Sequence, residues 1–118
     1  MTRCLNMNFK KFHVYLADLD PGRGTEPGKV RPVVVVQTDL LNGNHSSTIV
    51  CPLTTNVDME MDILRVHLDD KLPGMRDSDV MVDQVRAIDN RRFIKHLGRI
   101  TPRQEEKLME NLKLLILE

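Results

Sequence analysis

The sequence predicts a mainly β protein, a small and strongly bent β-barrel with one α-helix at its C-terminal end. Three observations support this prediction. Short apolar segments with the periodicity of strands recur along the chain, loops rich in Gly and Pro separate them, and only the last stretch has helical spacing. With 118 residues, of which 41% are hydrophobic, the chain can bury one modest core. Many short strands followed by one helix are typical of small barrels.

The first part of the chain contains two strands joined by a long loop. Residues 12–19 alternate between two sets of side chains, which favours a strand. Residues 20–29 contain two Pro and three Gly, which predicts a loop. Residues 31–37 include four consecutive valines, so this strand should be buried on both faces. Pro32 fits the start of such a strand, because proline has no N–H to donate to the ladder.

The middle of the chain contains shorter apolar segments. A polar loop with the turn Asn42-Gly43-Asn44 precedes a strand at residues 48–53, and alternation favours a half-exposed strand at 64–68. Pro73-Gly74 then predicts a turn. The elements expected before the terminal helix are one strand at residues 79–88 with Val80 and Val82 inward, a short helical turn at 89–92 and a last strand at 94–100.

The C-terminal helix has the clearest local signals. Thr101 is expected as the N-cap, Pro102 as the first helical residue and Gln104 as the partner that completes a capping box. The apolar residues that follow form one stripe at helical spacing, which predicts packing on the barrel or at a subunit interface. The stripe consists of Leu108, Met109, Leu112, Leu115 and Ile116.

Composition argues against several classes of function. A formal net charge of zero argues against a general nucleic-acid coat protein, and an aromatic content of 3% against a sheet that stacks bases on exposed rings. Cys4 and Cys51 make no disulfide framework, and the four histidines lack metal-ligand spacing, so no metal or cofactor is expected. No segment is apolar enough for a signal peptide or a membrane span, which predicts a cytoplasmic protein without a membrane partner.

Several segments occur together in the order and at the intervals of one known family. They are residues 14–21, residues 24–26, residues 31–37 with Asp39 and Asn42, residues 49–54, residues 83–89 and the terminal helix. On these segments, the chain resembles the MazF/PemK family of type II toxin–antitoxin endoribonucleases over nearly its full length. Residues 12–118 are therefore expected to form a single toxin domain and residues 1–11 a flexible extension, with the natural start at Met1 or Met7.

The resemblance implies a fold, an activity and partners. The implied fold is an SH3-like (CcdB/PemK-type) β-barrel with a C-terminal α-helix, assembled as a homodimer. The implied activity is metal-independent, sequence-specific cleavage of single-stranded RNA, including mRNA, by attack of the 2′-OH, which leaves a 2′,3′-cyclic phosphate and a 5′-OH. The implied protein partner is a cognate antitoxin that lays a flexible segment in the RNA groove. The alternatives on the same superfold are a gyrase poison, which the ring-free C-terminal end argues against, and a non-catalytic binding protein.

Four residues are candidates for the catalytic set, of which Arg31, Thr54 and Asp83 match active-site positions of the family and Glu26 is the best-placed carboxylate. Arg31 is expected to stabilise the transition state, because its fork of N–H donors fits a phosphate; otherwise it is a surface ion pair. Thr54 is expected to donate to a non-bridging oxygen, or else to satisfy a local backbone group. Glu26 is expected to act as the base or to orient Arg31, unless it is a solvated loop residue. Asp83 matches a position that some relatives use as a base, although Met81 stands where some of them have arginine.

Five further residues are candidates for contacts with RNA bases and phosphates. The alternative for Gln84 is a buried hydrogen-bond network, and the alternative for Arg86 is an ion pair with Asp89. His67 is expected either to line an RNA groove or to be an ordinary exposed histidine of a strand. The five candidates are Gln84, Arg86, Lys29, Thr55 and His67.

Overall fold

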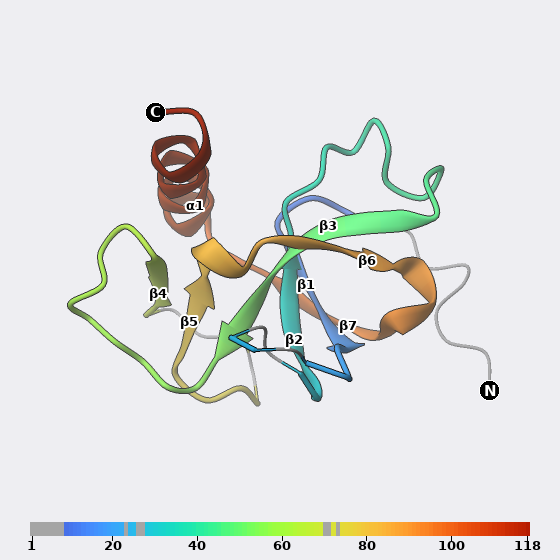
Figure 1. The fold of residues 1–118 in the computed structure, drawn as a ribbon, viewed down its shortest axis with the longest axis horizontal. Coiled ribbons are helices and arrows are strands. Elements are labelled where there is room, and N and C mark those ends of the chain that lie inside the picture. The colour runs from blue at the N-terminus through green and yellow to red at the C-terminus, as the bar shows by residue number, and fades with distance from the viewer. Residues whose placement is uncertain (1–8, 23, 26–27, 70–71, 73) are drawn as a thin grey trace.

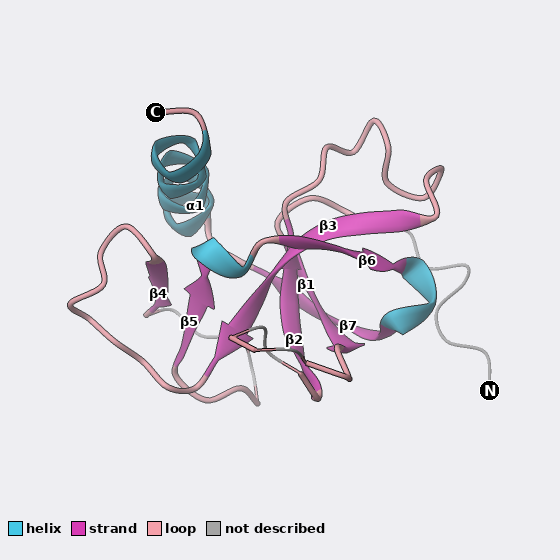
Figure 2. Ribbon diagram, viewed as in Figure 1, coloured by secondary structure: helices cyan, strands magenta, loops and turns pink. Residues whose placement is uncertain are grey.

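The computed structural model describes residues 9–22, 24–25, 28–69, 72 and 74–118. Its seven strands are antiparallel and follow the path β4-β5-β3-β2-β1-β7, and β6 pairs with β3 beside this path (Figure 1). Among these residues the two ends of the path do not pair, so the sheet is barrel-like but not closed. One α-helix follows the last strand (Figure 2). The predicted class, mainly β with a C-terminal helix, is confirmed.

Each strand that the sequence predicts is present within a few residues of its expected ends, apart from the segment at 79–88. The short helical turn expected at 89–92 is also present. No helix in the described part of the chain is long and apolar enough to cross a membrane. The elements are β1 (His13–Asp18), β2 (Val30–Val35), β3 (Ser47–Thr54), β4 (Arg65–Leu68), β5 (Ser78–Met81), η1 (Val82–Gln84), β6 (Arg86–Asp89), η2 (Asn90–Arg92), β7 (Phe93–Arg99) and α1 (Pro102–Ile116).

Strand β2 lies at the centre of the molecule and is buried on both faces, as its run of valines predicts. It pairs with β1 on one side and with β3 on the other. Val34 belongs to the hydrophobic cluster that contains Leu108 of the helix, whereas Val33 and Val35 belong to a second cluster with Phe93. All three valines are fully buried, so apolar burial on both faces holds β2 in register and gives its N-terminal end a rigid position.

The prediction of one strand at residues 79–88 is wrong, because a 3-10 turn divides it. Strand β5 pairs with the end of β3, at Leu53, whereas β6 pairs with the beginning of β3, at Val50. The two registers differ, and η1 takes up the extra residues between them. Pro52 lies opposite this break and has no N–H to offer a ladder, which gives a physical reason for the interruption.

The helix α1 begins as predicted but buries a narrower stripe than expected. Thr101 and Gln104 form the reciprocal hydrogen bonds of a capping box, with Pro102 in the first turn. Leu108 is fully buried and Leu112 is 9% exposed, so both pack into the core. The other members of the predicted stripe are largely exposed, namely Met109, Leu115 and Ile116.

The folded part of the chain begins before the predicted domain boundary at residue 12. Phe9 is only 3% exposed and its ring packs against Tyr15 and Phe93, with centroids 5.7 and 4.4 Å away. The backbone N–H of Lys10 donates to the Tyr15 hydroxyl, and that of Lys11 donates to Asp39. Residues 9–11 are therefore part of the packed domain, whereas the predicted flexibility of residues 1–8 concerns a segment outside the described residues.

Candidate active site

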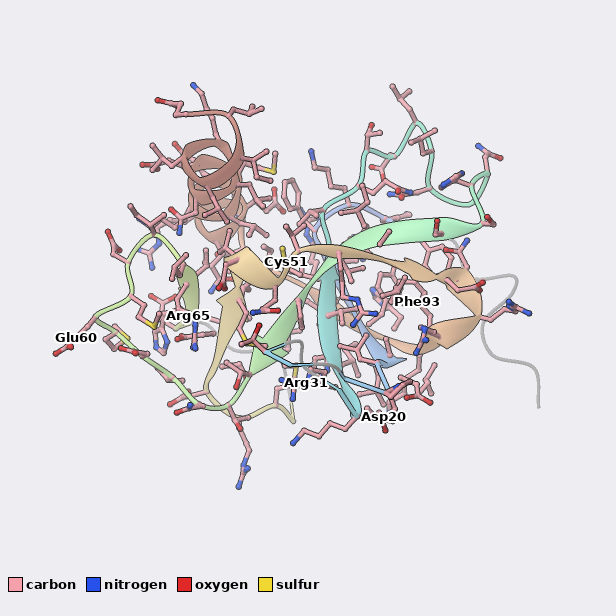
Figure 3. The ribbon with its side chains drawn as sticks, viewed as in Figure 1. Asp20, Arg31, Cys51, Glu60, Arg65 and Phe93 are labelled. Carbon is pink, nitrogen blue, oxygen red and sulfur yellow. The ribbon has the colours of Figure 1, made fainter. Side chains whose placement is uncertain are left out.

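Arg31 lies at the beginning of β2, where the buried strand reaches the surface (Figure 3). Its side chain is half-buried, and its Nε and Nη1 each donate to a backbone carbonyl, of Gly28 and Leu53, at 3.2 Å. Among the described residues no carboxylate forms an ion pair with it, so the alternative of a surface ion pair is not supported. Burial lowers the pKa of Arg31, and a poorly solvated cation of this kind favours an anionic ligand.

The loop between β1 and β2 holds Arg31 from one side. The Leu19 N–H donates to the carbonyl of Lys29 at 2.9 Å, and the Lys29 N–H donates to the Asp20 carboxylate. A Cβ at Gly28 would lie 2.7 Å from the backbone nitrogen of Gly22, so the close approach of the two loop segments requires glycine there. These bonds fix the carbonyl that accepts from Arg31.

A residue that sequence analysis missed, Arg92, also holds this loop. Its Nη1 donates to the backbone carbonyls of Asp18 at 2.9 Å and Asp20 at 2.7 Å. Because Arg92 comes from η2, far along the chain, the contact depends on the pairing of β1 with β7. A basic residue in a helical turn offers no local signal for such a contact.

Thr54 is the last residue of β3 and lies beside Arg31 in the sheet. Val33 pairs with Pro52, and the same register continued by two residues puts Arg31 opposite Thr54. The Thr54 Oγ1 accepts a hydrogen bond from the Asn56 N–H at 3.1 Å, which is the local backbone contact considered as an alternative. That bond uses an acceptor site of the hydroxyl and leaves its proton free to donate. The local backbone contact of Thr54 and the donation of its hydroxyl proton to a ligand are therefore compatible.

Beyond Thr54 the sheet carries a buried polar cluster that the sequence did not predict. Asp79 pairs in register with Thr54 on β3 and with His67 on β4. The Asp79 carboxylate is fully buried, and it accepts from Arg65 Nη1 at 3.1 Å and from His67 Nδ1 at 2.9 Å. His67 is thus tied to a buried acid instead of being a free histidine on an exposed face.

Of the two predicted acidic residues, the structure describes Asp83 and not Glu26. Asp83 is exposed on η1, and the described hydrogen bonds of Arg31 go to Gly28 and Leu53 and not to Asp83. Burial, and after it the charge of Asp83, raise the pKa of the Cys51 thiol to about 12. Gln84, also on η1, is half-buried. Glu26 lies outside the described residues.

The other predicted RNA contacts occupy different surroundings. Lys29 and Thr55 are exposed and adjoin the region of Arg31 and Thr54 in sequence. Arg86 is half-buried on β6, and its Nη1 is buried without a hydrogen-bond partner in the described part of the chain. The ion pair considered between Arg86 and Asp89 is wrong, because Asp89 pairs with Arg91 at 3.0 Å.

Metal ligands and cavities add little to this site. Within the residues that the structure describes, no group of three or more His, Cys, Asp or Glu could hold a metal ion. A cavity of about 360 Å³ lies between β4, the loop after β3 and α1. Arg65 and His67 line it, whereas Arg31 and Thr54 do not. The candidate site, at the N-terminal end of β2 and the C-terminal end of β3, is therefore separate from this cavity.

Comparison with known proteins identifies the family. The family described as PemK-like, MazF-like toxin of type II toxin–antitoxin system matches residues 10–116. The endoribonuclease EndoA of Bacillus subtilis is 34% identical over 109 residues, which cover 92% of this chain and 94% of that protein. The endoribonuclease MazF of Staphylococcus epidermidis is 34% identical over 98 residues, covering 82% and 79%.

Solved structures agree on the fold. MazF from Deinococcus radiodurans superposes with a TM-score of 0.79 at 23% identity, covering 93% of this chain and 97% of that one. A MazE–MazF complex from the same organism gives a TM-score of 0.73 at 23% identity, covering 92% and 96%. The chain belongs to the PemK-like, MazF-like toxins of type II toxin–antitoxin systems, and the toxin endoribonuclease function expected from its sequence is confirmed at the level of this family.

Proposed function

We propose that this toxin cleaves single-stranded RNA without a metal ion, at a centre formed by Arg31 and Thr54. The observation that carries the proposal is the state of Arg31. Its half-buried guanidinium is aimed by two backbone carbonyls, has no carboxylate partner among the described residues, and lies opposite a threonine with a free hydroxyl proton. A cation held in this way is preorganised for a phosphate.

The proposed reaction uses the RNA's own 2′-OH as the nucleophile. The 2′-oxygen forms a bond to the adjacent phosphorus, the bond from phosphorus to the 5′-oxygen breaks, and the products are a 2′,3′-cyclic phosphate and a 5′-OH. Arg31 stabilises the additional negative charge on the phosphorane, and Thr54 donates to a non-bridging oxygen. One proton leaves the 2′-OH and one is delivered to the 5′-oxygen. Glu26 and Asp83 are our candidates for the base, and Glu26 is also a candidate for orienting Arg31.

Contacts with the rest of the RNA strand are assigned to residues around this centre. Lys29 and Thr55 are exposed next to it and can meet the backbone of the strand. Arg86, which is half-buried on β6, is a further candidate for a contact with an RNA phosphate or base edge. Gln84 and His67 are the remaining candidates, and the recognition sequence would depend on these contacts.

The proposed partners follow from the relatives and from the surface of the chain. Solved structures of relatives include MazE–MazF complexes and a mycobacterial endoribonuclease with its cognate antitoxin. We infer that this toxin likewise binds a cognate antitoxin, and that it acts on mRNA in the cytoplasm as a homodimer. The exposed apolar side chains of α1, Met109, Leu115 and Ile116, are candidates for an interface between protomers.

The proposal is tested with purified, antitoxin-free protein and a long single-stranded RNA in EDTA. We expect discrete cuts whose ends carry a 2′,3′-cyclic phosphate and a 5′-OH, identified by end-specific ligation and labelling. The Arg31→Ala protein from the same preparation scheme should make none of these cuts, which controls for contaminating ribonucleases. Intact RNA after incubation with folded wild-type protein would reject the proposal and favour a gyrase-poison or binding function.

A further inference from the structure

We propose that the buried carboxylate of Asp79 is a positioning residue for RNA cleavage, acting through the loop that carries Thr54. The inference rests on the proposed function and assigns a role to a residue that does not itself touch the reacting atoms. Asp79 is fully buried on β5, in register with Thr54 on one side and His67 on the other. It accepts hydrogen bonds from three residues, two of them on β4 and one in the loop after β3.

A continuous set of hydrogen bonds joins Asp79 to Thr54. Asp79 Oδ2 accepts from Arg65 Nη1 at 3.1 Å, and the same Nη1 donates to the carbonyl of Asn56 at 2.9 Å. The N–H of Asn56 in turn donates to Thr54 Oγ1 at 3.1 Å. Arg65 lies between β4 and the loop that follows β3 (Figure 3). Arg65, which Asp79 orients, therefore holds the carbonyl of Asn56, the same residue whose N–H donates to the Thr54 hydroxyl.

A second contact from Asp79 reaches the same loop. The N–H of Asp58 donates to Asp79 Oδ2 at 2.8 Å, so the loop is held at residues 56 and 58. On the other carboxylate oxygen, His67 Nδ1 donates at 2.9 Å. A buried carboxylate is stable only with such donors around it, and removing its charge leaves them without their acceptor. Asp79 thus fixes the loop after β3 more rigidly than turn residues alone would.

The catalytic consequence concerns the direction of one proton. Because the Asn56 N–H occupies an acceptor site of Thr54 Oγ1, the hydroxyl proton points away from the loop, toward the surface shared with Arg31. If residues 54–58 shift, the hydroxyl loses this constraint while Arg31 keeps its own two carbonyl partners. Losing Asp79 should therefore lower the rate of the chemical step more than it weakens RNA binding.

The test is a double-mutant cycle on cleavage of a short RNA that contains one mapped cut site. Asp79→Asn keeps the shape of the side chain but removes its charge and one of its two acceptor oxygens. We expect kcat to fall roughly 10- to 100-fold with a small change in KM. In a Thr54→Val background, the same substitution should change kcat by less than about twofold, because the group on which it acts is already absent. The matched control is Asp62→Asn, an exposed acid on the same loop that pairs with Lys107.

Each outcome decides the proposal. Wild-type kcat in folded Asp79→Asn, or an undiminished loss in the Thr54→Val background, would overturn it while leaving the proposed function intact. If Asp79→Asn does not fold, the variant with both Asp79→Asn and Arg65→Gln leaves no unpaired buried charge in this pair and is judged by the same criteria. Amide hydrogen exchange of the wild-type protein supplies a readout that is independent of activity. Protected N–H groups at Asn56 and Asp58 are expected, and unprotected exchange there would overturn the proposal.

Failure of the proposed function has a different signature. If the wild-type protein does not cut RNA at all, the proposed function fails, whatever the exchange rates at Asn56 and Asp58 are. If it cuts RNA and Arg31→Ala does not, the proposed function stands, and only the behaviour of the Asp79 variants decides the positioning role.

Discussion

The two ends of β2 differ in how far their polar groups satisfy one another. At the N-terminal end, the Arg31 guanidinium has only backbone carbonyls as partners among the described residues, and the Thr54 hydroxyl keeps its proton free. At the C-terminal end, Gln37 and Asn42 form a closed network. Gln37 Nε2 donates to Asn42 Oδ1 at 2.9 Å, and Asn42 Nδ2 donates to the Gln37 carbonyl at 3.1 Å and to Asp39 Oδ1 at 2.9 Å.

On the proposed function, the difference separates a surface for binding RNA from a surface that contributes to stability. Gln37 and Asn42 are 5% and 8% exposed, and their bonds are directed at one another, so a ligand would have to break them. Arg31 is held just as firmly by the same buried strand, but its charge is left uncompensated by the described residues. The same strand thus supports both ends, and only one of them has donors left for a substrate.

The largest expected effect is on activity, at the N-terminal end. Arg31→Ala should reduce RNA cleavage by about 10³-fold or more, because it removes the main stabiliser of the phosphorane charge. The free energy of unfolding should stay within about 1 kcal/mol of wild type, since the residue is only half-buried and makes no described ion pair. Cleavage assays and urea denaturation measure the two quantities. A folded Arg31→Ala variant that retains activity would contradict the proposed difference between the two ends of β2.

At the C-terminal end the expected effect is on stability. Asn42→Ala removes the acceptor of Gln37 Nε2 at 2.9 Å and the donor to the Gln37 carbonyl at 3.1 Å, so we expect a loss of about 1–3 kcal/mol in the free energy of unfolding. Cleavage per folded molecule should remain close to wild type. Urea denaturation at constant m gives the stability change. A loss of activity in fully folded Asn42→Ala protein would show that the two ends are not independent.

A smaller effect on the rate of RNA cleavage is expected from a substitution in the loop before β2. The added methyl group of Gly28→Ala would meet the backbone nitrogen of Gly22 at 2.7 Å and must displace one loop segment. Because the Gly28 carbonyl accepts from Arg31 Nε, we expect kcat to fall by roughly tenfold, much less than in Arg31→Ala. The matched control is Gly24→Ala, which strains a backbone of φ +57° but brings no atom within 4 Å of the added Cβ, so it reports backbone strain in the same loop without a clash. Equal activity of the two alanine variants would argue against a contribution from this carbonyl.

The smallest expected effect is a pH dependence of stability near the C-terminal end of β2. Burial, followed by the charges of His96, Arg99 and Lys10, lowers the pKa of His13, while Asp39 opposes them. The unfolded chain therefore binds this proton more readily than the folded chain does. The contribution of His13 to the free energy of unfolding is fully present above pH 6.5, the ordinary pKa of histidine, and declines as the pH falls below that value. His13→Gln should show a smaller decline in Tm between pH 7.5 and pH 5.5. A decline in Tm identical to that of the wild-type protein would exclude His13 as the origin of the pH dependence.

Features that depend on neighbouring residues were predicted correctly from the sequence, whereas features that depend on residues far along the chain were missed. The valine run of β2, the capping box at Thr101 and the turn at residues 90–92 depend on neighbouring residues, and all three are present. The division of the segment at 79–88 depends on its pairing with two different parts of β3, which local periodicity does not contain. The partner of Asp89 was missed for a similar reason, because two basic neighbours compete for it and geometry selects Arg91.

The sequence by itself determined the class of fold and the family and proposed Arg31 as a catalytic residue, because alternation, capping and motif spacing are properties of the local chain. Only the tertiary structure decided what surrounds those residues. It put Thr54 opposite Arg31, joined His67 to Asp79, and buried Asp79 under the loop that follows Thr54. The physical reason is that strand register, set by burial of the core on both faces of β2, brings distant residues together, and no local pattern encodes that register.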